Sequence, residues 1–557
     1  MMAITKEGKF ITVTFDDTRK IKVPYKTKII DVVKSIENNL KPILALKINN
    51  ELRTYDYELV DDCTCEYIKL DSEDGYRVYS RTLKMVLYMA LTQLYSKADV
   101  EFITTIGREQ YFIIKNFKLT EEKIKTIKEK MREIINADFP INRRIVSFDE
   151  AEVLYKASDD ISKLDNMDNK LKNYVTMYFC NGMYNYFYGI LAPSTNYVNV
   201  FNLIKYRDGA LLVIPESNMK IPEKIGGIDE DRLYDSFISF NKLSRILNIS
   251  CTKELNDFVL NNKVIELIQI SEAIHQRQLV ELALDVEKRK SVKMVLIAGP
   301  SSSGKTTFAQ KLGVQLTLAG YNPVTVSMDN YFKERKDTPL GPDGKYDFER
   351  VDALDIDLFN KQMTELLSGK TVELPKFDFK VGTKKYDGDY LTLNSNDILI
   401  IEGIHALNPI ITKLVDDKHK YKIYISPIST LNIDGYTKIS STDTRILRRM
   451  VRDYTTRGHS IEKTFDLWPN VKKGEEKNIY PFTNTVDYIY NSSLMYEPLV
   501  MKNIAQPMLL QVKNDSQYYS EARRLYEFLN NFLPMDTAGI PIDSLMREFI
   551  GGGCFDR

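Results

Sequence analysis

One short stretch, GPSSSGKTT at Gly299–Thr307, constrains the fold of this 557-residue chain more than any other. Its first eight residues satisfy G-x-x-x-x-G-K-[ST]; the apolar run MVLIA precedes them and the helical run TTFAQKLGVQLTLAG follows. A glycine-rich turn between a strand and a helix directs backbone N–H groups and the positive end of the helix dipole at a phosphate. The alternative, a chance Gly/Ser loop, does not account for both flanking elements. The sequence therefore predicts a nucleoside-triphosphate-binding domain.

Phosphate ligands and a metal site follow from the same stretch. The predicted phosphate-binding residues are Gly299, Ser301, Ser302, Ser303, Gly304, Lys305, Thr306 and Thr307. Lys305 would reach the β- and γ-phosphates, and the Thr306 hydroxyl would bind Mg²⁺. Glu402 ends the apolar run DILIIE, at the edge where parallel sheets bind ligands, and is predicted to complete the metal site. The alternative for Glu402 is a solvated carboxylate. ATP is taken as the donor, although no adenine-specific residue is evident.

Two further features indicate phosphoryl transfer. Asp329 follows the second predicted strand, where it would orient or deprotonate an acceptor hydroxyl; the alternative is a turn-forming aspartate. The run DTRILRRMVRDYTTRGH places four arginines on one helix face and a fifth at its end: Arg445, Arg448, Arg449, Arg452 and Arg457. Most of them lack an acid at i−4, so a phosphate-clamping lid is predicted over the alternative of a solvated basic face.

The order of strand-like and helical patterns divides the chain into five predicted regions. Strands KMVLIA, NPVTVS, DILIIEG and YKIYIS alternate with helices, which predicts an α/β domain with a parallel sheet covered on both faces. Residues 9–70 predict a β-grasp-like α+β module, and Thr120 is predicted to cap an amphipathic helix. The regions are 1–70, an α+β region 71–237, a helical connector 238–290, the nucleotide-binding domain 291–515 and a helical tail 516–557.

Composition limits the partners and the compartment. The 77 basic and 77 acidic residues cancel, so no overall field attracts nucleic acid or a membrane surface. No apolar stretch reaches the roughly 20 residues of a membrane span, and the first residues lack the apolar core of a signal peptide. Five cysteines in such a long chain fit a reducing compartment, so we expect a cytoplasmic protein. The sequence leaves its oligomeric state open.

Residues 292–510 resemble the uridine–cytidine kinase and phosphoribulokinase family. The motifs that carry the resemblance are GPSSSGKTT, SMDNYF, YDFERVDALD, PKFDF, IIEGIHAL and DTRILRRMVRDYTTRGH. The resemblance implies that Asp329 is the catalytic base and Glu402 the metal-side carboxylate. It also implies that Arg449, Arg452 and Arg457 form the lid, and that Glu349 holds the ribose hydroxyls where the family uses Asp.

The acceptor side departs from that family. Phe377, Gly382 and His459 stand where uridine–cytidine kinases present Tyr, His and Arg to the pyrimidine ring. Loss of such polar partners weakens discrimination between bases. We place Glu349, Phe377 and Asp378 at the acceptor, with ring stacking or core packing as the alternatives for Phe377 and Phe379.

The predicted function is therefore Mg²⁺- and ATP-dependent phosphorylation of a small-molecule acceptor, a nucleoside hydroxyl in the leading reading. One rival is a kinase for another hydroxylated metabolite or a sugar phosphate, with Arg350 and Lys384 as candidate anion ligands. The other rival is an RNA- or ribosome-associated regulator that uses ATP as a switch.

The first half resembles parts of threonyl-tRNA synthetase. Residues 9–70 resemble a TGS domain, and residues 70–230 resemble the second additional domain, through DSEDGYRVYSRTLKMVLYMALTQLY and the AP-STNYV-NVFNLIKY run. The places of its metal-binding pairs hold Arg81, Met85, Phe187 and Leu191, and no histidine precedes His275. A histidine-based metal or editing site is thus excluded in this half. RNA binding through IGREQYFIIKNFK and NRRIV is weighed against a solvated surface, and a regulatory or dimerising role is the leading expectation.

Overall fold

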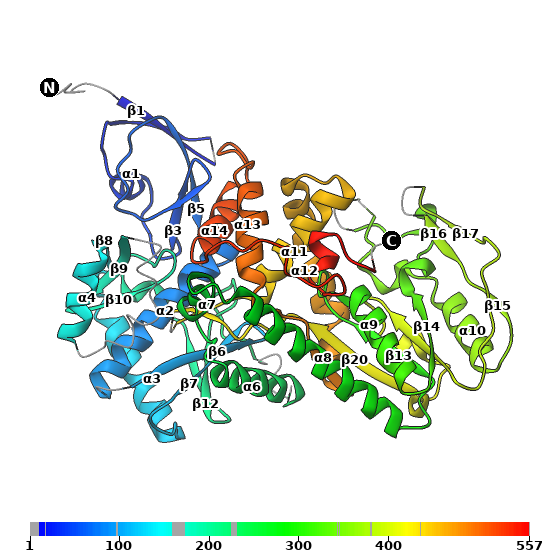
Figure 1. The fold of residues 1–557 in the computed structure, drawn as a ribbon. Coiled ribbons are helices and arrows are strands. Elements are labelled where there is room, and N and C mark those ends of the chain that lie inside the picture. The colour runs from blue at the N-terminus through cyan, green and yellow to red at the C-terminus, as the bar shows by residue number, and fades with distance from the viewer. Residues whose placement is uncertain are drawn as a thin grey trace.

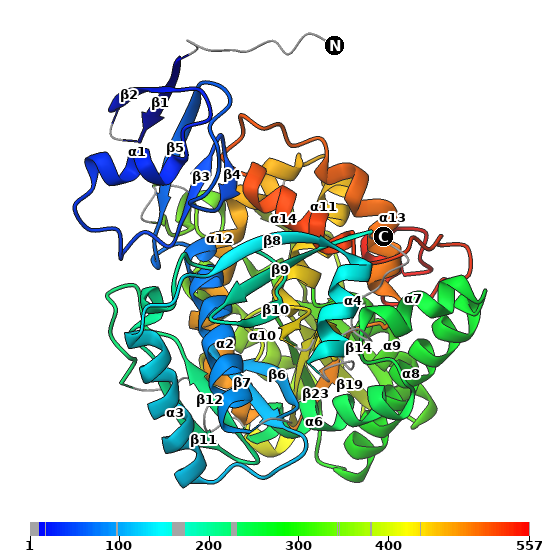
Figure 2. The same ribbon diagram turned by 90° about the vertical axis from the view of Figure 1, so that its left-hand side faces the viewer.

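The computed structural model describes residues 10–16, 18–95, 98–158, 173–223, 231–341, 344, 346–378, 381–434 and 436–555. The N-terminal module lies at one end of the molecule and the parallel sheet that carries the phosphate loop at the other (Figure 1). The C-terminal helices return between them, so segments far apart in the sequence lie side by side in both views (Figure 2).

The N-terminal module is a five-stranded sheet with one helix. Its elements are β1 (Phe10–Phe15), β2 (Lys20–Pro24), α1 (Ile29–Ile36), β3 (Ala45–Ile48), β4 (Glu51–Arg53) and β5 (Cys63–Ile68). The sheet order is β2-β1-β5-β3-β4, with β1 parallel to β5 and the other pairs antiparallel. The apolar face of α1, with Ile29, Val32 and Val33, packs on buried strand residues. The module is α+β; its membership of the TGS family stays a prediction.

The next region holds two antiparallel sheets and long helices. Its elements are α2 (Glu73–Leu94), β6 (Val100–Ile106), β7 (Glu109–Ile114), α3 (Glu121–Asn136), β8 (Asn142–Ser147), α4 (Phe148–Ala157), β9 (Tyr174–Cys180), β10 (Met183–Tyr186), a 3-10 helix (Thr195–Val198), β11 (Asn202–Tyr206) and β12 (Gly209–Val213). The sheets are β10-β9-β8 and β11-β12-β7-β6. The predicted cap of α3 is confirmed, because Thr120 accepts from the Lys123 N–H. Met85, Phe187 and Leu191, at the places of the synthetase metal ligands, are buried in one apolar core.

Helices fill the predicted connector. They are α6 (Asp231–Ile246), α7 (Thr252–Leu260) and α8 (Val264–Lys288). Buried residues of α8, including Leu279 and Leu282, belong to the same apolar cluster as Val295 and Ile297 of the parallel sheet. The last of these helices therefore covers one face of the sheet that carries the phosphate loop.

A five-stranded parallel sheet forms the core of the nucleotide-binding domain. Its strands are β13 (Met294–Ala298), β14 (Asn322–Ser327), β19 (Asp397–Glu402), β20 (Lys420–Ser426) and β23 (Tyr488–Asn491), in the order β14-β19-β13-β20-β23. The first four are the predicted strands, so the parallel sheet is confirmed. Every residue of β13 and β19 is buried, because helices cover both faces.

The helices of this domain are α9 (Lys305–Leu318), α10 (Ile356–Leu367), α11 (Ser441–Arg457), α12 (Ile461–Asn478) and α13 (Glu497–Leu509). Small two-stranded ribbons are β15 (Val372–Glu373) with β18 (Tyr390–Leu391), β16 (Lys376–Asp378) with β17 (Thr383–Lys385), and β21 (Asn432–Asp434) with β22 (Thr437–Lys438).

The C-terminal tail, with α14 (Tyr519–Leu529) and α15 (Arg547–Ile550), packs back on the rest of the chain. Leu545 contacts the phosphate loop, and α15 lies beside α11. Within the described ranges, no helix combines the length and apolar character needed to span a membrane.

Candidate active site

The phosphate loop joins β13 to α9 and depends on two glycines. A Cβ on Gly299 would lie 2.1 Å from the Ile425 carbonyl oxygen, so any larger residue collides with backbone. Gly304 has φ of 92°, in the left-handed region, and a Cβ there would lie 2.5 Å from Leu545 Cδ2. The loop geometry thus requires glycine at both fixed positions of the motif.

Polar groups of the loop point inward. Lys305 Nζ donates to the carbonyl oxygens of Gly299 at 2.9 Å and Pro300 at 3.2 Å. Burial lowers the pKa of Lys305, and the carboxylates of Glu402 and Asp329 oppose that effect. The Ser302 and Ser303 hydroxyl oxygens are buried without a hydrogen-bond partner within the described part of the chain. Such unsatisfied groups beside a buried cation fit a site that binds an anion.

Two carboxylates already occupy N–H groups of this loop. Glu475 Oε1 accepts from the Ser301 N–H at 2.9 Å, and Glu548 Oε2 accepts from the Thr307 N–H at 3.0 Å. Loop N–H groups and the start of the following helix are the donors that hold phosphates in such motifs. Glu475 comes from α12 and Glu548 from the tail, so sequence spacing gave no signal for either contact.

Carboxylates gather beside Lys305 at the edge of the sheet. Glu402 ends β19 and pairs in register with Ser327 of β14, whose hydroxyl donates to Glu402 Oε1 at 2.8 Å. Burial, and next the charge of Asp329, raises the pKa of Glu402 to about 7, against the opposing charge of Lys305. Asp329 lies in the 3-10 helix Met328–Tyr331, with its side chain exposed. The structure therefore brings Lys305, Asp329 and Glu402 within electrostatic reach of one another.

The residues present fit a magnesium ion held together with phosphates. Among the residues that the structure describes, no group of three or more His, Cys, Asp or Glu side chains could hold a metal alone. Mg²⁺ bound with a nucleotide needs only one or two carboxylates besides the phosphate oxygens. Glu402, buried with a raised pKa, supplies a carboxylate whose charge a cation would stabilise. The Thr306 hydroxyl, in the first turn of α9, would be the second protein ligand.

The arginines of α11 fall into two groups rather than one lid. Arg445 and Arg448 are buried. Arg445 Nη2 donates to Glu475 Oε2 at 2.9 Å, and Arg448 donates to both oxygens of Glu497 at 2.6 Å. Each also donates to a loop carbonyl, that of Ser301 at 3.3 Å or Ser302 at 3.4 Å. The expectation that these two arginines belong to a phosphate-clamping lid is therefore corrected: they bind the backbone of the phosphate loop and buried glutamates.

The other three arginines surround one buried acid. Arg449 lies 3.2 Å, Arg452 2.8 Å and Arg457 3.4 Å from the carboxylate of Asp453. Arg449 Nη1 also donates to Ser301 Oγ at 2.8 Å. Burial and the neighbouring charge of Arg452 lower the pKa of Arg457, which Asp329 partly offsets. The sequence analysis does not include Asp453 among the candidate residues, although its position four residues from both Arg449 and Arg457 indicates ion pairs with them.

Glu349 lies on the same side of the site as these cations. Burial raises its pKa to about 7, against the charge of Arg449 and Lys305. The side chain packs on Gly474, where a Cβ would lie 2.6 Å from Glu349 Cβ. Asn478 fixes the backbone by donating to the Glu349 carbonyl at 2.8 Å. Glu349 is therefore a half-buried acid within electrostatic reach of Lys305 and Arg449.

The two predicted acceptor ligands in PKFDF have structural partners. Phe377 is 8% exposed and packs on Phe332 with ring centroids 5.9 Å apart, which is the core-packing alternative. Asp378 binds Lys385 Nζ at 2.8 Å and the Val381 N–H at 3.2 Å, within the β16–β17 hairpin. A role of either residue at the acceptor stays a prediction, and Phe379 lies outside the described residues.

The cations proposed for a phosphorylated acceptor are already paired. Arg350 donates to Asp352 at 2.8 and 2.6 Å, and Lys384 forms an ion pair with Asp355. Their charges are compensated by neighbours. A strongly positive acceptor pocket is thus not supported at these two positions.

Comparison with known proteins shows similarity over this part of the chain. The model of the phosphoribulokinase / uridine kinase family matches residues 294–494. A uridine kinase of Halobacterium salinarum is 28% identical over 35% of this chain and 77% of its own length. A uridine kinase of Macrococcus caseolyticus is 32% identical over 31% of this chain and 75% of its own. A solved structure, "Structure of a Possible Uridine Kinase from Bacillus stearothermophilus", aligns with 36% of this chain and 89% of that chain at 18% identity, with a TM-score of 0.25.

Proposed function

Because the chain belongs to the phosphoribulokinase / uridine kinase family through residues 294–494, we propose that it transfers the γ-phosphoryl group of ATP to a nucleoside hydroxyl. One observation carries the proposal: Lys305, Asp329, Glu402 and the Arg449–Arg457 end of α11 converge on one site. A hydrolase would need a positioned water, whereas this site places an exposed carboxylate beside the phosphate loop. That arrangement suits an acceptor that enters from solution.

In the proposed reaction Asp329 accepts the proton of the acceptor hydroxyl. The acceptor oxygen forms a bond to the γ-phosphorus, the bond from that phosphorus to the β–γ bridging oxygen breaks, and ADP leaves. Lys305, Arg449 and Arg457 would stabilise the negative charge on the migrating group. Asp453 would hold these arginines in place, since it pairs with both Arg449 and Arg457.

Thr306 and Glu402 would hold Mg²⁺ with the phosphates of ATP. The bound ion would neutralise charge on the phosphate oxygens. Ser327 supports this role, because its hydroxyl fixes one oxygen of Glu402 and leaves the other for a ligand.

A nucleoside acceptor is supported by the relatives, whereas its base is open. Glu349 would accept from ribose hydroxyls. Three residues stand where the family reads the base. Phe377 is buried in the core, and a side chain added at Gly382 would collide with Arg335. The third, His459, lies 4.0 Å from Asp453. We therefore expect the chain to tolerate several bases.

The test is a panel of nucleosides and sugar phosphates incubated with Mg·ATP, with the products separated and identified by mass. We expect a nucleoside monophosphate, and we expect Asp329→Asn to abolish transfer while ATP affinity stays nearly unchanged. A phosphorylated sugar phosphate without nucleoside product would favour the other metabolite kinase. No product at all, together with slow hydrolysis and salt-sensitive RNA binding, would favour the ATP-switched RNA regulator.

A further inference from the structure

A cavity of about 420 Å³ lies between α2, the β8–β10 sheet, β4 and α14. Its wall includes Arg81 of α2, Arg143 of β8, and Arg524 of α14. No described residue of the phosphate loop lines it. It is therefore separate from the candidate active site.

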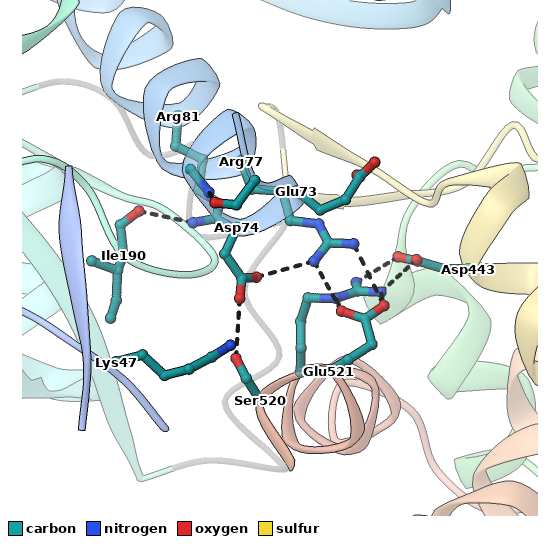
Figure 3. Close-up of polar contacts among 12 residues, drawn as sticks. Lys47, Glu73, Asp74, Arg77, Arg81, Ile190, Asp443, Ser520 and Glu521 are labelled. Atoms are coloured by element: carbon teal, nitrogen blue, oxygen red, sulfur yellow. Dashed lines mark hydrogen bonds and ion pairs between the residues drawn. The ribbon is translucent and has the colours of Figure 1, made fainter. Parts of the chain in front are cut away.

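Most charged groups on the wall are neutralised by ion pairs. The acids Glu51, Asp74 and Glu527 pair with Arg53 at 2.6 Å, Arg77 at 3.2 Å and Arg523 at 2.9 Å, respectively. Arg524 lies 2.7 Å from both Asp443 and Glu521. Glu521 also accepts from Arg77 of α2 at 2.9 Å (Figure 3). The wall thus carries no excess of negative charge.

Arg81 is the exception on α2. Its Nη1 donates to the Ile190 carbonyl at 2.8 Å, away from the carboxylates that bind Arg77 (Figure 3). Among the described residues, no carboxylate forms an ion pair with it. Burial lowers the pKa of Arg81 to about 10. A guanidinium in this position retains N–H groups for a further acceptor.

Gly189 makes room for that guanidinium. It has φ of 106°, and a Cβ there would lie 2.5 Å from Arg81 Cζ. The Gly189 carbonyl accepts from the Tyr178 hydroxyl at 2.7 Å, so the loop is held in place. The position of Arg81 on the wall is thus built by the loop beneath it.

Arg143 is the second cation on the wall without a carboxylate among the described residues. Successive side chains on a strand point to opposite faces. Arg144, the next residue, lies 3.5 Å from Glu150 and over the ring of Phe179, and it does not line the cavity. The Arg143 side chain is hydrogen-bonded to Tyr178, a neutral partner, whereas Arg144 pairs with an acid. The strand therefore presents one arginine whose charge is balanced by Glu150 and, on its other face, one whose charge is not balanced by a described carboxylate.

Aromatic rings line another part of the wall: Phe148, Tyr174, Tyr186, Phe187 and Tyr188. Such rings accommodate a planar apolar group. Two guanidinium groups without a carboxylate partner in the described part of the chain match the two charges and the oxygen geometry of a phosphate monoester.

We propose that this cavity binds a small organic phosphate monoester whose phosphate contacts Arg81 and Arg143 and whose planar ring lies among the aromatic side chains. This inference goes beyond the proposed kinase reaction and does not depend on it. A carboxylate on the same kind of ring would offer only one charge, so we expect it to bind more weakly.

The test uses calorimetric titration of the full chain with phenyl phosphate, phenylacetate and inorganic phosphate. Mg²⁺ and a non-hydrolysable ATP analogue are kept saturating, so that the phosphate loop is filled. We expect phenyl phosphate to bind most tightly and Arg81→Met or Arg143→Met to weaken it by about tenfold or more. Arg144→Met, the matched control on the opposite face, should leave the affinity unchanged.

Gly189→Ala gives a second route to the same result, because its methyl group would displace the Arg81 guanidinium without removing its charge. Melting temperatures identify any variant that fails to fold. The proposal is overturned if phenyl phosphate does not bind, if Arg144→Met weakens binding as much as Arg143→Met, or if phenylacetate binds more tightly than phenyl phosphate.

Discussion

The candidate active site holds acids whose pKa values are raised, whereas the cavity beside α2 holds an arginine without a carboxylate partner among the described residues. At the phosphate loop, Glu402 is buried and Glu349 is half-buried, and burial raises both pKa values to about 7 against the charges of Lys305 and Arg449. In the cavity, the cation Arg81 has a backbone carbonyl as its partner. A buried charge without a counter-charge is costly, so its sign indicates the sign of the ligand that would stabilise it. The first region suits a cation brought with a nucleotide, and the second suits an anion.

A buried arginine that pairs with a carboxylate shows how large the stability effect of a compensated charge should be. Arg448 is fully buried and donates to both oxygens of Glu497. Arg448→Met should lower the free energy of unfolding by about 3–5 kcal/mol, because Glu497 would remain buried without its partner. Denaturant unfolding measures this loss. If the free energy of unfolding of Arg448→Met equals that of the wild type, a buried ion pair does not distinguish arginines that stabilise the fold from arginines that act in the site.

Substitution of Arg449, the next residue on α11, should reduce activity while changing stability little. Its Nη1 reaches Ser301 Oγ in the phosphate loop, and Asp453 keeps two other arginines as partners when Arg449 is lost. We expect Arg449→Met to reduce kcat by about 10²–10³-fold, as for removal of one preorganised donor to a charged transition state. Stopped-time product assays with the acceptor found in the panel measure the rate. A stability loss equal to that of Arg448→Met would place both residues in the same structural role.

These two adjacent arginines also show what the sequence could predict. The loop, four of the five sheet strands and the Thr120 cap depend on neighbours within a few residues, so their patterns are local. The partners Glu475 and Glu497 lie 30 and 49 residues from Arg445 and Arg448, and only the folded chain brings them together. The fifth strand, β23, has only four residues and gave too short a pattern. The sequence does not decide whether Phe377 stacks on a substrate ring or packs in the core, because an aromatic side chain suits both roles.

The raised pKa of Glu402 predicts a pH-dependent affinity for Mg²⁺. With a pKa of about 7, Glu402 is mostly protonated at pH 6 and mostly ionised at pH 8, and Mg²⁺ binds the ionised form. We expect the apparent Mg²⁺ affinity, measured with a non-hydrolysable ATP analogue, to rise about tenfold from pH 6 to pH 8. Glu402→Gln is the control, since it keeps the titration of the nucleotide. The same pH dependence in that variant would remove Glu402 from the metal site.

The smallest predicted effect concerns the stability of the cavity wall in the absence of a ligand. Arg81 has no carboxylate partner among the described residues. Arg81→Met should therefore raise the free energy of unfolding slightly, by no more than about 1 kcal/mol, because it removes a charge that no carboxylate balances. Glu521 is the contrasting residue, because it lies 2.9 Å from Arg77 and 2.7 Å from Arg524. Glu521→Gln should lower the free energy of unfolding by about 2 kcal/mol.

Thermal unfolding of the two variants, with and without phenyl phosphate, tests this contrast. Phenyl phosphate should raise the melting temperature of the wild type but not that of Arg81→Met, because a ligand stabilises only the folded state that binds it. A large loss of stability in Arg81→Met without ligand would mean that the wall already compensates this cation. The charge of Arg81 would then not indicate an anionic ligand. Only the acids of the phosphate loop would still indicate the charge of a ligand.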